Sequence, residues 1–344
     1  MKKKNLVIIS NEKTHYSKGN FFCDNIDMKS IPEGLQKSFN IELFVRKSMS
    51  VRSGHKINLK KIIISYGIIS YILNILKSSG SNQKYLIISI SPYTFIICML
   101  LFFLKKKVYV YLRSDGFEEY KQYSKYFGPL IYKIMFNLAS WKSNLIACRS
   151  RILRGKKGII VSPSQLSKKW LVKRKPAKLK KINLLYVGRI KIEKGTFSLL
   201  KILNTTKLKF KILLVNSERN QNKILENKNI KITYFGKNHE NLIKIYDKCN
   251  IFILPSFTEG HPQVLDESLS RLRPVIIFPE ISHVKRNREG VFISQRNHKS
   301  LFEKINFILK RYKFIQRKML KNKLPTKTSF LNELQEIISS EKQL

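Results

Sequence analysis

The chain has 344 residues, a hydrophobic fraction of 43% and a formal net charge of +45. This length allows two domains that each bury a core, and the apolar fraction excludes a disordered chain. The charge, with a pI near 10.2, favours anionic partners such as nucleic acid, an anionic bilayer surface or a phosphate-bearing small molecule. The simplest explanation of the charge is compositional, because lysines are scattered through every segment.

The cysteines and the apolar runs bear on the compartment. The four cysteines, which form no CxxC pair or Cys/His cluster, are Cys23, Cys98, Cys148 and Cys249. We expect free thiols in a reducing compartment and no metal bound through sulfur. The first apolar run, residues 6–9, is too short for a signal peptide, and the stretch 94–104 has about half the length that spans a bilayer. The prediction is a cytoplasmic protein, at most peripheral on the inner face of the cell membrane.

Strand and helix patterns alternate through the first half of the chain. Strands are predicted at residues 6–10, 41–46, 85–91, 108–113, 142–150 and 158–162, and helices at 60–76, 92–104 and late in the segment 11–34. Such alternation indicates a parallel sheet covered on both faces. Ser162 or Ser164 is the expected cap of a following helix. The basic run 173–181, broken by Pro176, predicts a domain boundary.

The loop after the strand 108–113 is a candidate site in this half. It reads Arg113-Ser114-Asp115-Gly116, and ligands of open α/β sheets bind beyond the carboxyl ends of strands. An Asp-Gly turn that only joins a strand to a helix is at least as consistent with the pattern.

A second alternating series begins with the buried strand 182–187, which ends at Gly188 and Arg189. Five residues later, Lys194 precedes a helix for which Thr196 is the expected cap. Gly188 permits close backbone approach, and two cations at a strand end can neutralise a diphosphate from two sides. In so basic a chain, the same residues also fit an ordinary solvated loop.

The stretch 250–277 is predicted as a strand, a loop, a helix that starts at Pro262 and a second strand. Glu259 lies in the loop, and Glu267 lies about five residues inside the helix, roughly 7 Å along its axis. Two such carboxylates can hold the two ends of one extended ligand, and Gly260 allows the backbone close to it. A first-turn charge and a solvated helix position explain the pair equally well.

The residues of this stretch resemble a known family. PSFTEGHPQVLDES followed by PVI is similar to the donor-binding signature of retaining group-1 glycosyltransferases, also called family 4, whose glutamates are spaced E-x7-E. Glu259 and Glu267 have that spacing. GRIKIEKG, with Arg189 and Lys194, resembles the family's GRxxxxKG element. The resemblance is strong over residues 182–309 and only architectural before them.

The resemblance implies roles for these residues. Glu259 would contact the donor sugar near the reaction centre, Glu267 the ribose hydroxyls, and Arg189 and Lys194 the donor diphosphate. The catalytic set is then Glu259, Arg189 and Lys194, and the donor-binding set is Gly188, Gly260, His261, Pro262 and Glu267. On the acceptor side, where the family commonly has a histidine, only Asp115 and Arg113 are present. Gly19 is the nearest match to the family's first glycine-rich loop, and Leu272 stands where a glycine usually ends the helix.

By the same resemblance the expected fold class is α/β of the GT-B architecture, with two facing Rossmann-like domains that have parallel sheets and a cleft between them. The expected domains are residues 1–175 on the acceptor side, 176–312 for the donor, and a basic helical tail, 313–344, that packs back on the first.

The expected reaction moves a hexosyl group from a UDP- or GDP-type sugar to an acceptor hydroxyl with retention. The resemblance favours a glycan or glycolipid acceptor in cell-surface polysaccharide synthesis. No cofactor or metal is expected, since no Asp-x-Asp element is present and a donor phosphate oxygen would take the acceptor proton.

Two other functions fit the sequence. One is a non-catalytic basic protein on a transferase scaffold that binds nucleic acid or an anionic membrane, although no specific nucleic-acid element is apparent. The other is an enzyme of similar fold that releases the sugar without transferring it. An anionic membrane surface also remains a predicted partner of the transferase, through the apolar segments 62–76 and 95–104.

Overall fold

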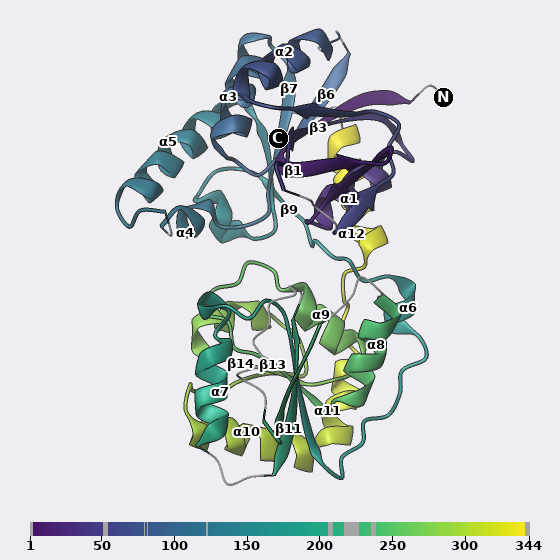
Figure 1. The fold of residues 1–344 in the computed structure, drawn as a ribbon, viewed down its shortest axis with the longest axis vertical. Helices are drawn as coiled ribbons and strands as arrows, with labels where there is room; N and C mark the ends of the chain where they lie inside the picture. The colour runs from purple at the N-terminus through teal and green to yellow at the C-terminus, as the bar shows by residue number, and fades with distance from the viewer. Residues whose placement is uncertain are drawn as a thin grey trace. The chain divides into compact units, whose positions relative to one another are not determined.

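The computed structural model describes residues 3–50, 54–78, 80, 82–121, 123–205, 209–216, 227–234 and 239–340. The chain divides into two compact units, coloured along the chain in Figure 1. Unit 1 is Met1–Pro163 with Lys327–Leu344, and unit 2 is Ser164–Thr326. Each unit is described by itself.

Unit 1 is a parallel sheet with helices on both faces. Its strands are β1 (Lys4–Ser17), β2 (Asn20–Cys23), β3 (Phe39–Lys47), β4 (His55–Ile57), β5 (Ile62–Ser65), β6 (Gln83–Ile88), β7 (Lys107–Leu112), β8 (Asn144–Ala147) and β9 (Ile159–Ile160). Its α-helices are α1 (Asp27–Leu35), α2 (Ile68–Ser78), α3 (Pro92–Phe103), α4 (Gly116–Lys121), α5 (Phe127–Lys142) and α12 (Lys327–Ser339). The parallel order is β5-β3-β1-β6-β7-β8-β9, and the end of β1 pairs antiparallel with β2, which β4 extends.

Alternate side chains of the central strands divide the core of unit 1 into two layers. Val7 and Ile9 of β1 face one layer, which holds α2, α3 and α5. Leu6 and Ile8 face the other layer, which holds α1 and α12. The strands are therefore apolar on both faces, as parallel strands between two helical layers must be.

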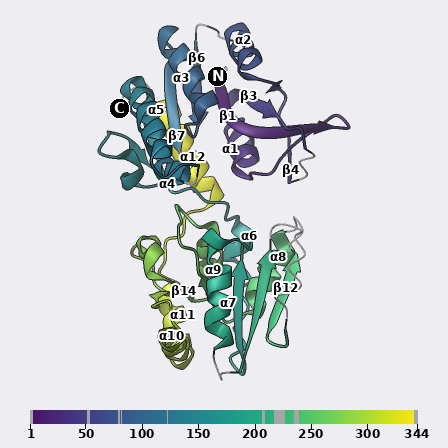
Figure 2. The ribbon, with the colours of Figure 1, turned by 60° about the vertical axis from the view of Figure 1, so that its left-hand side comes forward.

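Unit 2 is a second parallel sheet with helices on both sides (Figure 1 and Figure 2). Its strands are β10 (Ile182–Val187), β11 (Phe210–Asn216), β12 (Ile230–Tyr234), β13 (Ile251–Leu254), β14 (Val275–Ile277) and β15 (Val291–Ile293). Its α-helices are α6 (Lys168–Leu171), α7 (Thr196–Asn204), α8 (His239–Lys248), α9 (Gln263–Ser270), α10 (His298–Lys310) and α11 (Tyr312–Met319). The order β12-β11-β10-β13-β14-β15 is that of the dinucleotide-binding Rossmann sheet. The predicted α/β class with two Rossmann-like domains is confirmed.

Several element predictions in the first half were wrong. Residues 62–65 are the strand β5, because the Tyr66-Gly67 bend separates them from α2. The polar start of the segment 11–34 predicts a loop before the helix, but residues 11–23 are part of the hairpin of β1 and β2. The helix after Ser162 starts only at Lys168, so neither Ser162 nor Ser164 caps it.

Three helix ends in unit 2 also differ from expectation. Gly195, not Thr196, is the N-cap of α7, and Pro262 is the N-cap of α9 rather than its first residue. Leu272 adopts φ +55 beyond the end of α9, and the Arg273 amide bonds to the Ser268 carbonyl at 3.0 Å. This is the helix end for which the family uses glycine, formed here by a leucine at a cost of about 1–2 kcal/mol. The apolar run at residues 230–235 also predicts a strand; β12 covers it as far as Tyr234, and residue 235 lies outside the described residues.

The units divide at residues 163/164 and 326/327, where the sequence predicted 175/176 and 312/313. Two buried arginines attach the basic linker to unit 2. Arg271 donates to the carbonyl oxygens of Trp170, Val172 and Lys173, and Arg273 donates to that of Lys175. Helix α11 belongs to the core of unit 2, whereas α12 packs in unit 1 through Phe330, Leu334, Ile337 and Ile338.

Candidate functional site

The predicted donor residues converge at one edge of unit 2. Strands β10 and β13 lie side by side at the point where the strand order of the sheet reverses. The loop after β10 and the loop after β13 therefore lie on opposite sides of this point. Ligands of open α/β sheets bind at such a point, beyond the carboxyl ends of the strands. A pocket of about 300 Å³ lies there. Its lining residues are Tyr186, Val187, Gly188, Arg189, Lys194, Leu254, Ser256, Glu259, His261, Pro262, Gln263 and Val264.

Six of the eight predicted donor-side residues line this pocket; Gly260 lies in the same loop but, like Glu267, is not among the lining residues. Geometry requires two glycines here. A Cβ on Gly188, at φ +155, would lie 2.8 Å from the Tyr186 hydroxyl. A Cβ on Gly195, at φ +65, would lie 1.9 Å from the Pro255 carbonyl oxygen. The loops after β10 and β13 can therefore pack closely only with glycine at residue 195.

An ion pair joins the two motifs across the pocket. Lys194 Nζ lies 2.7 Å from Glu259 Oε1, and the Ser256 hydroxyl donates to the same oxygen at 2.7 Å. Both side chains of the pair are largely buried, with 22% and 12% exposed. The Phe257 amide also donates to the Glu193 carbonyl at 3.0 Å, so main-chain contact holds the loops together. The pair is therefore in fixed geometry before any ligand binds.

Arg189 reaches the same pocket from an exposed position. The Tyr186 hydroxyl donates to the Arg189 carbonyl oxygen at 2.6 Å, which fixes the main chain at this lining residue. Arg189 and Lys194 thus place two cations in one pocket with a single lining carboxylate, Glu259.

Polar contacts to its imidazole ring hold His261 in place. Its Nε2 lies 3.1 Å from Asp266 Oδ2, and Arg286 approaches its Nδ1 at 3.4 Å. We assign the proton to Nε2, because Nδ1 then accepts from the guanidinium. Arg288 lies 2.7 Å from the other Asp266 oxygen, close enough for an ion pair but without hydrogen-bond alignment. The ring of His261 therefore anchors the loop, and the main-chain groups of this residue are the ones available to a ligand.

Glu267 lies on α9 beneath this loop. The Tyr246 hydroxyl donates to its Oε2 at 2.9 Å. Part of the residue is exposed, but its carboxyl group is enclosed. This burial raises the pKa of Glu267 to about 7, although the hydrogen bond from Tyr246 by itself lowers it. Burial also raises the pKa of Tyr246, which keeps it a donor. Glu267 is thus a carboxyl poised to titrate near neutral pH.

Sequence reasoning missed several residues of this site: Tyr186, Tyr246, Ser256, Asp266, His283, Arg286 and Arg288. His283 contacts the Glu259 carbonyl oxygen through Nε2 at 2.9 Å. Most of these residues contact the site from segments that are distant in the chain, so no short-range sequence pattern marks them. Ser256 and Asp266 had a signal, since both lie in the quoted motif PSFTEGHPQVLDES, three residues before Glu259 and one before Glu267.

The three acceptor-side residues of unit 1 are not brought together in one cluster. Gly19, with Lys18, forms the left-handed turn between β1 and β2 and has open space around its Cβ position. Asp115 accepts from the Phe117 amide and pairs with Arg154 at 3.0 Å. Gly19 and Asp115 are thus explained by local structure.

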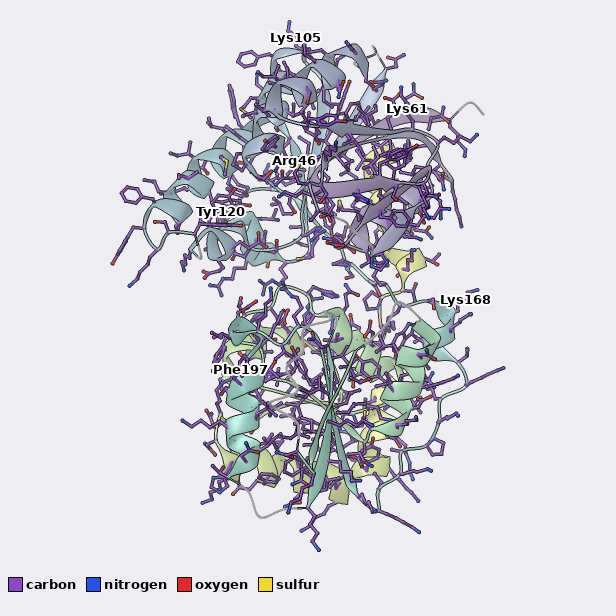
Figure 3. All side chains as sticks on the ribbon, in the orientation of Figure 1. Arg46, Lys61, Lys105, Tyr120, Lys168 and Phe197 are labelled. Carbon is purple, nitrogen blue, oxygen red and sulfur yellow. The ribbon has the colours of Figure 1, made fainter. Side chains whose placement is uncertain are left out.

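Arg113 instead belongs to a charged group at the carboxyl edge of the sheet of unit 1. Its guanidinium lies 3.5 Å from Asp27 Oδ2. Burial raises the pKa of Glu12, and Arg113 and backbone hydrogen bonds lower it. Arg46, labelled in Figure 3, donates to Asn11 Oδ1 at 2.9 Å and stacks over the Tyr93 ring at 3.7 Å. No sequence pattern marks Arg46 or Glu12, which come from strands without a motif.

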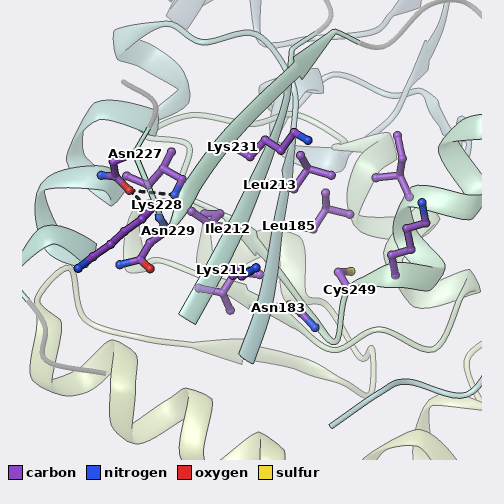
Figure 4. A pocket seen from close by; sticks show the side chains of 14 residues that line it. Asn183, Leu185, Lys211, Ile212, Leu213, Asn227, Lys228, Asn229, Lys231 and Cys249 are labelled. Atoms are coloured by element: carbon purple, nitrogen blue, oxygen red, sulfur yellow. Dashed lines mark hydrogen bonds between the residues drawn. The ribbon is translucent and has the colours of Figure 1, made fainter. Parts of the chain in front are cut away.

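A larger cavity of about 530 Å³ lies at the other end of the unit 2 strands (Figure 4). It is lined by apolar strand residues, three asparagines and exposed lysines, such as Lys211 and Lys231, and by no carboxylate or histidine among the described residues. The described part also holds no group of three or more His, Cys, Asp and Glu side chains fit for a metal ion. The first pocket is therefore the better candidate for chemistry.

Comparison with known proteins places this site in a family. Residues 168–325 match the family model described as "Glycosyl transferases group 1". That range contains every donor-side residue of the pocket. No curated protein matches the sequence.

Solved structures match nearly the whole chain in fold. Sucrose-phosphate synthase from Thermosynechococcus elongatus is 16% identical with a TM-score of 0.65, covering 98% of this chain and 96% of that one. HepE from Anabaena in complex with UDP and glucose is 11% identical with a TM-score of 0.69, covering 98% and 100%. A Burkholderia xenovorans α,α-trehalose-phosphate synthase in complex with glucose-6-phosphate is 8% identical with a TM-score of 0.67, covering 98% and 100%.

Residues 168–325 therefore match the group-1 glycosyltransferase family, and both units have the fold of solved glycosyltransferases of the GT-B architecture. The predicted resemblance is confirmed. No helix of the described residues is long and apolar enough to cross a membrane.

Proposed function

We propose that the protein transfers a sugar from a nucleotide-diphosphate sugar to an acceptor hydroxyl with retention of anomeric configuration. The observation that carries this proposal is the Lys194–Glu259 contact of 2.7 Å in the pocket at the switch point of unit 2. It joins a cation suited to a phosphate with a carboxylate suited to sugar hydroxyls. A donor with a sugar on one side of a diphosphate requires this pairing.

The remaining residues supply the other parts of a donor site. Arg189 is the second cation for the diphosphate, and the ionised Glu267 can accept from two adjacent ribose hydroxyls. The main chain of Gly260, His261 and Pro262, just before α9, offers N–H groups and carbonyl oxygens to the sugar. The pocket of about 300 Å³ is at the lower limit of ligand pockets, so a nucleotide-sugar would extend beyond it toward Glu267.

The transfer breaks the bond between the anomeric carbon and the diphosphate oxygen and forms a bond from that carbon to the acceptor oxygen. The leaving diphosphate keeps the bonding electrons, and Arg189 and Lys194 stabilise its charge. A diphosphate oxygen takes the acceptor proton, so the proposal needs no protein base. Glu259 holds the sugar as its ring gains positive charge. In this scheme the two cations do the work of a metal ion, which is the reason we propose a metal-independent reaction.

For the acceptor we propose a glycan or glycolipid of the cell surface, with the protein on the cytoplasmic side. The HepE structure contains UDP and glucose, and the trehalose-phosphate synthase structure contains glucose-6-phosphate. Both support a hexosyl donor and a hydroxyl-rich acceptor here. The charged group of Arg46, Arg113 and Glu12 in unit 1 is the place where we propose that acceptor polar groups bind.

The test is binding of UDP and GDP by calorimetry, in buffer with EDTA, to the wild type and to Glu267→Ala. Saturable binding of one nucleotide, lost in the variant, is expected. Glu303→Ala is the matched control, because Glu303 is an exposed glutamate on α10 of the same unit and its loss should leave binding unchanged.

Transfer itself is then followed with the sugar form of the bound nucleotide. The anomeric coupling in the product, measured by NMR, should match that of the donor. Inversion would overturn the retaining mechanism alone, and release of free sugar without acceptor would favour the hydrolytic function. Binding of neither nucleotide would favour a non-catalytic basic protein.

A further inference from the structure

One helix of unit 1 is apolar on the side that faces away from the core. The exposed large apolar side chains of α5 are Phe127, Leu130, Ile131, Ile134, Leu138 and Trp141. Phe127 is 69% exposed and Trp141 is 74% exposed, and the other four are 45–54% exposed. We call this set the outer face of α5. Residues 127, 131, 134, 138 and 141 follow each other at steps of four and three, so they form one stripe along the helix.

The opposite side of α5 already contributes to the core. Tyr132, Met135, Phe136 and Ala139 are buried in the layer against the sheet. A helix that is apolar on both sides is normally covered on both sides. Within the described residues, the outer face has no such cover, since its side chains remain about half exposed or more.

Neighbouring helices extend this surface. Helix α3 packs beside both α5 and α2 in one layer. Phe103 at the end of α3 is 86% exposed and Ile69 of α2 is 72% exposed. Figure 3 shows the side chains of this layer, with Lys105 labelled just after α3. Exposed apolar side chains therefore occur on each of three helices that pack in one layer.

The charged residues of α5 have one sign, whereas α4, which packs on it, has Glu118 and Glu119. Residues 123–142 contain three lysines, Lys125, Lys133 and Lys142, all exposed, and no aspartate or glutamate. Residues 92–107 likewise contain three lysines, at 105–107, and no acid. An apolar helix face with exposed lysines and an aromatic end is the composition of helices that lie in the interface of an anionic bilayer.

We propose that the outer face of α5, with the exposed ends of α2 and α3, docks unit 1 onto the surface of an anionic lipid bilayer. The aliphatic side chains enter the boundary between headgroups and acyl chains, Trp141 lies at the interface, and the lysines contact lipid phosphates. A second copy of the chain fits less well, because two copies of the outer face of α5 would bring their lysines together, and α5 has no carboxylate to pair with them.

This inference places the membrane contact differently from the sequence. Residues 62–65 of the predicted apolar segment 62–76 are the edge strand β5, which pairs with β3, and the sequence did not single out α5. It does not rest on the proposed function, because lipid binding is measured without donor or acceptor.

The test is sedimentation with vesicles of phosphatidylglycerol and phosphatidylcholine at low salt. The wild type should bind, and Trp141 emission should shift to shorter wavelength, since Trp170, the other tryptophan, is buried in unit 2. Ile134→Gln with Leu138→Gln should weaken binding roughly tenfold or more, because these exposed side chains lose their apolar transfer energy. High salt or pure phosphatidylcholine should also weaken it, since lysine attraction is then screened or absent.

The matched control is Phe314→Gln with Leu320→Gln, two exposed apolar residues of unit 2, 54% and 56% exposed. It should bind vesicles like the wild type, and circular dichroism spectra and thermal unfolding midpoints close to those of the wild type show that both variants are folded. A wild type that stays in the supernatant with unchanged emission overturns the proposal, as does equal weakening in both variants. A wild-type dimer that Ile134→Gln with Leu138→Gln makes monomeric, without vesicle binding, would assign the face to a second copy.

Discussion

The carboxyl edges of the two sheets differ although both units have the same kind of fold. In unit 2, the loops after β10 and β13 meet in one pocket, where Lys194 and Glu259 form a pair that faces a ligand site. In unit 1, Asp115 pairs with Arg154 and caps α4, and Arg113 lies beside Asp27. The difference shows that the carboxyl edge of such a sheet can be recognised as a site from the sequence only where the loops after adjacent strands contain motifs. Four substitutions test this comparison.

The largest expected effect is on the stability of unit 2, from Asp247→Ala. Asp247 accepts two hydrogen bonds of 2.9 Å from Arg271, and Arg273 lies 3.8 Å away, all with side chains at most 6% exposed. Removing it leaves two buried cations without their partner, which should cost about 3–5 kcal/mol. Denaturant unfolding followed by Trp170 fluorescence, in a Trp141→Phe background, measures it.

The control for that experiment lies in unit 1. Glu118 forms an exposed pair with Lys121, so Glu118→Ala should change stability by less than about 0.5 kcal/mol. If Asp247→Ala were equally mild, the buried arginines would not be what fixes the linker to unit 2.

The next largest effect is on catalysis, from Lys194→Met. Loss of one fixed cation at the leaving group should lower kcat by about 10²–10³-fold. Lys201→Met on α7 removes an exposed lysine of the same unit and should leave kcat unchanged. Equal losses in the two variants would mean that overall charge matters, and not the position of Lys194.

A pH effect should follow from Glu267. With its pKa raised to about 7, only about a tenth of the carboxyl is ionised at pH 6, so nucleotide affinity should rise roughly tenfold from pH 6 to pH 8. Calorimetry across this range measures it. Glu267→Gln should remove the dependence that belongs to the protein and leave only that of the nucleotide phosphate.

The raised pKa of Glu267 also makes the stability of the protein depend on pH. The unfolded carboxyl ionises near pH 4.5 and the folded one near 7, so Glu267 lowers the free energy of unfolding as pH rises between these values. Glu267→Gln should therefore have a higher Tm than the wild type at pH 8 and a similar Tm at pH 4. A lower Tm at pH 8 would contradict the buried, proton-favouring environment.

The smallest effect is expected in unit 1, from Asp115→Asn. Asparagine can still cap α4 but loses the Arg154 ion pair, whose arginine is 35% exposed. Stability should fall by only about 0.5–1 kcal/mol, and nucleotide affinity should not change. A large loss of nucleotide affinity would mean that unit 1 contributes to the donor site, and the comparison between the two edges would fail.

The sequence alone determined the donor half of the site. Gly188, Arg189, Lys194, Glu259 and Glu267 lie in two short segments whose spacing carries the resemblance, and the buried strands 182–187 and 251–254 place them. Period and spacing suffice here because each motif is local in sequence. The alternation of strands and helices likewise predicted the α/β class of both units.

The tertiary structure alone decided which groups hold those residues and where the units divide. Tyr246 meets Glu267, His283 meets Glu259, and Arg271 and Arg273 hold the linker, all through contacts between segments distant in the chain. The outer face of α5 is the same kind of case. Its apolar residues look like core residues in the sequence, and only the packing of the opposite side shows that they face outward. Periodicity identifies an apolar side chain, but burial depends on what the rest of the chain leaves uncovered.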